Sequence, residues 1–98
     1  GAPAVIVPVY RKEGLPVQDM AQIDMSIAQE NIWLETDALG LGGVWIGIAP
    51  FEDRMALVHD ILQLPENVEV FSLFALGYPA ESRMQQDRFD KSRIHFVE

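Results

Sequence analysis

The chain has 98 residues, which is enough for a single domain over residues 1–98. Its formal net charge of −8 argues against a nucleic-acid-binding protein, whose affinity comes mainly from cations that neutralise phosphates. The sequence contains no cysteine, so disulfides, cysteine-bound metals and cysteine nucleophiles are excluded. No apolar run reaches the roughly 18 residues of a membrane span. We therefore expect a cytoplasmic globular protein.

The sequence begins with a predicted strand and continues with a long predicted helix. Residues 4–10 are apolar and rich in β-branched side chains, a composition typical of a strand. Pro8 has no N–H to donate, so it is expected at an edge, an end or a bulge. The helix is predicted over residues 19–39. Asp19 and Gln22 have the spacing of a capping box at its start, and Gly40 suits the position after its end.

This predicted helix is apolar around most of its circumference. One stripe consists of Met20, Ile23, Ile27, Leu34 and Ala38, and a second consists of Ala21, Met25, Ala28, Ile32 and Leu39. The polar face between them is narrow and consists of Gln22, Ser26, Gln29 and Glu30. A helix of this kind is buried on most sides. One small chain cannot easily bury it, so we expect a second subunit to cover one face.

The second half of the sequence predicts alternating strands and helices. The expected elements are an extended segment at 44–50, a helix at 50–62, a buried strand at 68–76, a charged loop at 80–92 and a short strand at 93–98. The helix at 50–62 has Glu52 and Asp53 in its first turn, where the helix dipole favours negative charge. The predicted order is therefore β-α-β-α-β-β.

Two glycine-containing segments are candidates for a binding site. The cluster at 40–43 follows a helix and precedes an extended segment, which is the reverse of a dinucleotide-binding loop, so a helix end with a tight turn is favoured. The segment at 47–50 is more informative, because Gly47 lets a flat ligand approach the backbone. Trp45, two residues before Gly47, is expected on the same side of the extended segment as Gly47. The alternative is an ordinary strand-to-helix turn with a tryptophan in the core.

Cations are few and are concentrated near the C-terminus. The stretch 83–93 contains Arg83, Arg88, Lys91 and Arg93 against Asp87 and Asp90, which leaves a local charge of +2. One arginine can donate two parallel hydrogen bonds to two oxygens of a phosphate, so the cluster suits a single phosphate group. The alternative is a solvated charged loop.

The sequence predicts no metal site and no catalytic side chain. The two histidines lack metal-ligand spacing, and no nucleophile motif is present. Any chemistry would therefore require a cofactor.

Five motifs in this order resemble the C-terminal half of the FMN-dependent nitroreductase family. They are residues 24–31, 39–47, 64–66, 75–81 and 88–95. The resemblance implies an α+β fold, a nitroreductase-like α/β sandwich with a mostly antiparallel sheet flanked by helices. It also implies a homodimer in which the C-terminal strand is exchanged. Members of the family bind FMN at the subunit interface and transfer hydride from NAD(P)H to nitroaromatics, quinones or similar acceptors.

The resemblance also assigns candidate cofactor-binding residues. It implies that Trp45, Ile46, Gly47 and Ile48 line the isoalloxazine ring, with backbone N–H groups around Gly47 near N5. It implies that Arg88 binds the FMN phosphate, with Arg93 as a second candidate. The Arg- and Ser-rich first helix of the family is absent, so the sequence resembles a fragment of a longer chain. We expect this piece alone to bind FMN weakly or not at all.

Overall fold

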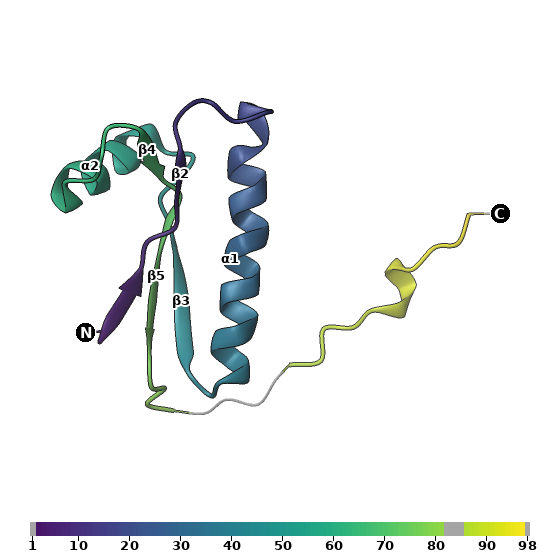
Figure 1. The fold of residues 1–98 in the computed structure, drawn as a ribbon. Helices are drawn as coiled ribbons and strands as arrows, with labels where there is room; N and C mark the ends of the chain where they lie inside the picture. The colour runs from purple at the N-terminus through teal and green to yellow at the C-terminus, as the bar shows by residue number, and fades with distance from the viewer. Residues whose placement is uncertain (1, 82–85, 98) are drawn as a thin grey trace.

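The computed structural model describes residues 2–81 and 86–97 of the chain. Its elements in chain order are strands β1 (Ala4–Ile6) and β2 (Val9–Arg11), 3₁₀ turn η1 (Gln18–Met20), helix α1 (Ala21–Ala38), strand β3 (Gly42–Gly47), helix α2 (Glu52–Leu62), strands β4 (Val68–Val70) and β5 (Ser72–Gly77), and 3₁₀ turn η2 (Lys91–Arg93). Figure 1 shows α1 alongside β3, and α2 beside β4 at one end of the molecule. The predicted alternation of strands and helices through β5 is confirmed, but the single strands predicted at 4–10 and 68–76 are each divided into two strands that belong to different sheets.

All strand pairs described are antiparallel. β5 lies between β1 and β3 in a three-stranded sheet, and β2 pairs with β4 in a second, two-stranded sheet. The register aligns Ile6 with Phe74 but Val9 with Val70, so one chain segment has an extra residue between these pairs. This is the geometry of a β-bulge. Pro8 lies between the end of β1 and the start of β2, opposite the extra residue, and accepts a hydrogen bond from the Phe71 N–H at 2.9 Å, which agrees with the prediction of an edge, an end or a bulge.

The first core lies between α1 and the three-stranded sheet. Trp33 of α1 contacts Trp45 of β3 and Phe74 of β5 edge-on, with ring centroids 6.3 and 5.8 Å apart. Phe74 is fully buried. A Cβ built on Gly43 would come within 2.2 Å of the Phe74 ring, so the absence of a side chain at this position makes room for the aromatic ring.

A second core lies under α2. Ile48, Met55 and Val70 are buried together, and partly buried apolar side chains surround them. Met55 lies on the inner face of α2, and Val70 ends β4. This cluster fixes α2 against the end of β3, because Ile48 directly follows that strand. The start of α2 is thereby held next to Gly47.

The predicted C-terminal boundary of α1 is confirmed, and the predicted capping box is not. Gly40 has φ +76°, its N–H donates to Asp37 O, and the Leu41 N–H donates to Thr36 O, as in a Schellman motif. At the other end, α1 follows η1 and its first residue receives no side-chain cap. Gln22 instead donates its amide N–H to the Tyr10 hydroxyl at 3.0 Å, because β2 packs against this end of the helix.

The orientation of α1 differs from the predicted one. Gln29, assigned to the polar face, is fully buried and accepts a hydrogen bond from the Ser72 hydroxyl at 2.7 Å. Most of the first apolar stripe is exposed instead, in Met20, Ile23, Ile27 and Leu34. We call these four residues the outer stripe of α1. The helix turns a few polar groups inward, with the Gln29 Oε1 hydrogen-bonded to Ser72, and leaves the outer stripe uncovered.

The predicted final strand at 93–98 is not formed within this chain. Arg93 belongs to η2, and residues 94–97 are assigned to no strand, while residue 98 lies outside the described part. Figure 1 shows that this C-terminal arm (residues 86–97) runs away from both sheets. A strand requires a partner edge for its hydrogen bonds, and the arm meets none among the described residues of its own chain.

The face of the three-stranded sheet opposite α1 is apolar and exposed. Side chains alternate along a strand, so Val44 and Ile46 point away from the face that carries Trp45. Val5 faces the same way, because it pairs with Ala75, which also pairs with Val44. These valine and isoleucine side chains are exposed. The described chain therefore covers one face of this sheet and leaves the other open.

Replacing Gly43 with alanine is expected to destabilise the fold. The new Cβ would overlap the Phe74 ring, and overpacking of this kind costs about 1–3 kcal/mol. Gly42→Ala is the matched control, since a Cβ there meets Pro79 Cβ at an ordinary 3.5 Å. Urea unfolding of both variants checks the prediction. Equal stability of the two variants would show that Phe74 does not depend on the space above Gly43.

Replacing Gln63 with glycine is expected to stabilise the chain by about 1 kcal/mol. Gln63 follows α2 with φ 51°, in the left-handed region where a Cβ is unfavourable. Its N–H donates to Asp60 O, and this bond needs no side chain. Gln63→Ala retains the Cβ and is expected to give no such gain. A melting temperature for Gln63→Gly at or below that of Gln63→Ala would contradict the prediction.

Candidate functional site

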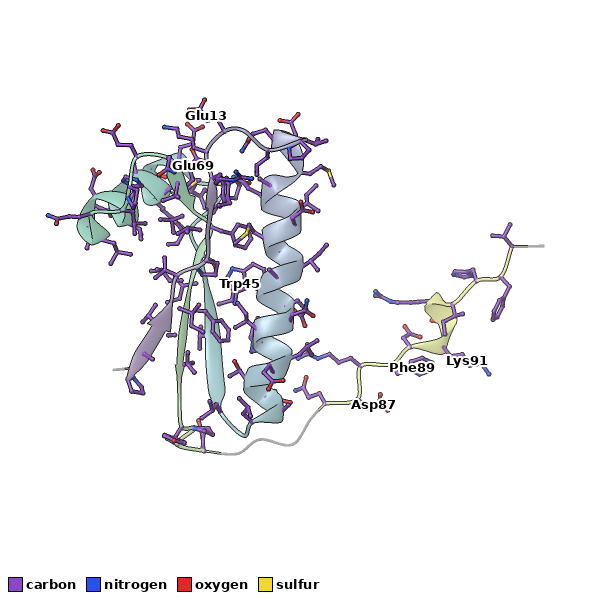
Figure 2. All side chains as sticks on the ribbon, viewed as in Figure 1. Glu13, Trp45, Glu69, Asp87, Phe89 and Lys91 are labelled. Carbon is purple, nitrogen blue, oxygen red and sulfur yellow. The ribbon has the colours of Figure 1, made fainter. Side chains whose placement is uncertain are left out.

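The four predicted ring-binding residues, three at the end of β3 and Ile48 directly after it, do not share one surface. Trp45 is half-buried and faces α1, as Figure 2 shows, whereas Ile46 is 43% exposed on the opposite face. The Trp45 ring also lies 5.8 Å from that of Phe71. One flat ligand therefore cannot contact both side chains on the same face. Within this chain Trp45 packs in the core, as expected if residues 47–50 are an ordinary strand-to-helix turn.

Gly47 is the open position of the segment. It is exposed, and a Cβ built on it meets no atom within 4 Å. β3 is an edge strand of the described sheet, so its last residue borders free space. Ile48 is 6% exposed and packs into the second core, so only its backbone is available to a ligand. A planar ring can approach the backbone at Gly47, so this end of β3 has the open space that the predicted flavin site requires.

A cation that sequence reasoning did not select lies beside Gly47. Arg54, in the first turn of α2, donates from Nη1 to the Gly47 carbonyl oxygen at 3.3 Å. Its guanidinium carbon lies 4.5 Å above the centroid of the Phe51 ring. The sequence feature that could have indicated Arg54 is its position in the first turn of the helix after Gly47. Phosphate binding was instead assigned to the arginines of the C-terminal cluster.

A buried polar pair supports the sheet behind Gly47. Ser72 is the register partner of Gly47, and its hydroxyl donates to Oε1 of Gln29. Both side chains are fully buried. In the described part of the chain Gln29 Nε2 has no hydrogen-bond partner. This pair ties the middle of α1 to the strand next to β3.

The predicted phosphate-binding arginines lie in the C-terminal arm, and the structure does not bring them to Gly47 of the same chain. Arg88 donates twice to Gln86 Oε1, at 3.1 and 3.3 Å. Arg93 pairs with Asp90 at 3.6 Å. Hydrogen bonds from Ser92 lower the pKa of Asp90, which keeps this carboxylate charged. Figure 2 shows Lys91 in the same arm, and Arg83 lies outside the described residues.

A cavity of about 930 Å³ lies at the opposite end of β3 from the glycine turn, among α2, β4 and the segment that follows β2. None of the predicted site residues lines it. Glu13 and Glu69, labelled in Figure 2, are two of the five acidic residues in its wall. Tyr10 donates to Glu69 at 2.7 Å, and burial followed by this contact raises the pKa of the tyrosine. The cavity therefore shares no residue with the predicted flavin site.

No helix within residues 2–81 and 86–97 has the length and apolar character needed to cross a membrane.

Residues 1–78 match the model of the nitroreductase family. A relative from Methanothermobacter thermautotrophicus, named as an NADH dehydrogenase/NAD(P)H nitroreductase, is 49% identical over 72 residues, which make up 74% of this chain and 38% of the relative.

Two solved structures extend this likeness to the fold. A Clostridium acetobutylicum protein named as an NADH oxidase superposes with a TM-score of 0.87 and 39% identity, over 96% of this chain and 57% of that one. A Bacteroides fragilis nitroreductase with bound FMN superposes with a TM-score of 0.68 and 27% identity, over 99% of this chain and 52% of that one. The chain spans about half the length of these proteins. With the family match covering most of its residues, the chain belongs to the nitroreductase family.

Proposed function

We propose that this chain is part of an FMN-dependent NAD(P)H oxidoreductase that reduces nitroaromatics, quinones or similar acceptors. The observation that carries the proposal is the exposed Gly47 at the end of an edge strand, with open space where a side chain would be. Membership of the nitroreductase family supports it. The FMN bound to the Bacteroides fragilis relative indicates which flavin to test first.

Each candidate residue has a distinct task in this proposal. Gly47 admits the flavin ring to the backbone, because any larger residue would occupy the open space. Trp45 holds β3 against α1 and so keeps that backbone in place. Arg88 and Arg93 bind the phosphate through charge-assisted hydrogen bonds. FMN, when bound, supplies the hydride-transferring group, while the protein provides orientation and electrostatics.

A homodimer in the cytoplasm completes the proposal. The outer stripe of α1 leaves Met20, Ile23, Ile27 and Leu34 at 42–61% exposure, a row of apolar side chains that a second copy would cover. The C-terminal arm carries Phe89 and Phe96, which are 75% and 89% exposed. An arm with exposed aromatic rings and no strand partner within residues 2–81 and 86–97 of its own chain suits exchange between two copies.

The alternative is a dimerising or flavin-binding piece that does not catalyse. Two observations favour it for this chain in isolation. The chain spans about half the length of the structures it resembles. Within one copy, the arm that carries Arg88 and Arg93 also runs away from β3 (Figure 1). NAD(P)H-dependent bleaching of bound flavin, followed by recovery on addition of a quinone, separates the two functions.

Gly47→Val is expected to abolish FMN binding without unfolding the chain. The valine side chain would fill the space that the ring needs, yet its Cβ meets no protein atom within 4 Å. The measurement is flavin content after purification, followed by titration with FMN and a melting curve. Gly42→Ala, at the other end of β3, is the control and should bind as the unmodified chain does.

Equal FMN affinity of folded Gly47→Val and the unmodified chain would remove Gly47 from the site. If the unmodified chain takes up no FMN from a saturating solution, flavin binding by these 98 residues is refuted. The non-binding form of the alternative function would then be favoured.

Arg88→Ala is expected to weaken FMN binding by about 1–3 kcal/mol, the range for a hydrogen bond to a charged group. Riboflavin lacks the phosphate, so its affinity should not change. Arg93→Ala tests the second candidate in the same way, and Arg11→Ala removes an exposed cation of β2 as the control. An equal loss of riboflavin affinity would show that Arg88 does not act through the phosphate.

A further inference from the structure

Arg54 makes two contacts that together hold it at the end of β3. Its Nη1 donates to the Gly47 carbonyl oxygen at 3.3 Å, and its guanidinium stacks over the Phe51 ring at 4.5 Å. Glu52 and Asp53 precede Arg54 in the sequence, yet within the described residues Arg54 forms no ion pair with either carboxylate. The side chain is thus directed to the backbone of Gly47 rather than to the neighbouring carboxylates.

The contact with Gly47 constrains one particular peptide group. The peptide bond is planar, so fixing the Gly47 carbonyl oxygen also fixes the opposite direction of the Ile48 N–H. Glycine has the greatest backbone freedom of any residue, and Gly47 lies exposed at a strand end. Ile48 is anchored on the other side by its burial in the second core. Arg54 therefore restrains the flexible half of this peptide.

Arg54 also brings positive charge to a chain with a net charge of −8. A guanidinium has five N–H donors, and within the described residues Arg54 uses one of them in its hydrogen bond to Gly47. The remaining donors lie at an exposed position of α2. They can therefore interact with a group that approaches Gly47.

We propose that Arg54 is a positioning residue of the flavin site: it orients the Gly47–Ile48 peptide and adds positive charge where the ring binds. This inference rests on the proposed function. A nearby cation stabilises whichever state of the ring carries more negative charge, which is the reduced state. Arg54 is therefore expected to make the bound flavin easier to reduce.

The first experiment needs no flavin. Amide resonances and hydrogen exchange of Gly47 and Ile48 are compared by NMR in the unmodified chain, in Arg54→Gln and in the control Arg11→Gln. We expect Arg54→Gln to shift both resonances and to speed their exchange, with no such change in Arg11→Gln. Unchanged resonances and exchange in Arg54→Gln would overturn the positioning role.

The second experiment measures FMN affinity and the midpoint potential of bound FMN for the same variants and for Arg54→Lys. Arg54→Gln is expected to bind about two- to tenfold more weakly, the loss of one modest hydrogen bond, and to shift the potential to a more negative value. Arg54→Lys retains the charge but not the planar fork, so it should restore the potential more than the amide resonances.

The two proposals fail in different ways. If the unmodified chain binds FMN and Arg54→Gln matches it in affinity and potential, the role of Arg54 toward flavin is overturned and the proposed function stands. If the unmodified chain binds no FMN, flavin binding by these residues alone and the flavin role of Arg54 within them are refuted together. The NMR comparison still decides whether Arg54 orients the peptide.

Discussion

The packing of Phe74 is the constraint on which the rest of the structure depends. Its strand, β5, pairs with both β1 and β3, so every strand of the larger sheet is aligned through it. Its ring is fully buried, meets Trp33 of α1 and occupies the space above Gly43. This one side chain therefore sets the distance between helix and sheet. It also fixes the position of β3, whose far end carries Gly47.

The orientation of α1 follows from polar contacts that a hydrophobicity pattern does not contain. Gln29 and Gln22 would be solvated on an isolated helix, yet Ser72 and Tyr10 provide hydrogen-bonding partners beside the sheets. A buried polar group is tolerated when such a partner is present. Turning these groups inward leaves the outer stripe of α1 exposed. The apolar pattern thus predicted correctly that α1 has more apolar surface than one chain covers, but assigned the wrong face to water.

The candidate site divides into a part that sequence could indicate and a part that it could not. Gly47 was selected from its place between a strand and a helix, and the structure shows open space there. The phosphate-binding role of Arg88 and Arg93 stays a prediction, since their arm lies apart from β3 in one copy. Arg54 was missed because its relevance depends on how α2 folds back against β3. That packing arises from Ile48 and Met55, not from any motif around Arg54.

The sequence by itself determined the alternation of strands and helices, the end of α1 at Gly40 and the interruption of the first predicted strand at Pro8. These features are local, because apolar periodicity, a residue without a Cβ and a residue without an N–H act within a few positions of the chain. The tertiary structure alone decided which face of α1 is buried, that residues 94–97 form no strand within one copy, and that Arg54 reaches Gly47. Each of these depends on a partner surface distant in the sequence, and only folding brings such surfaces together.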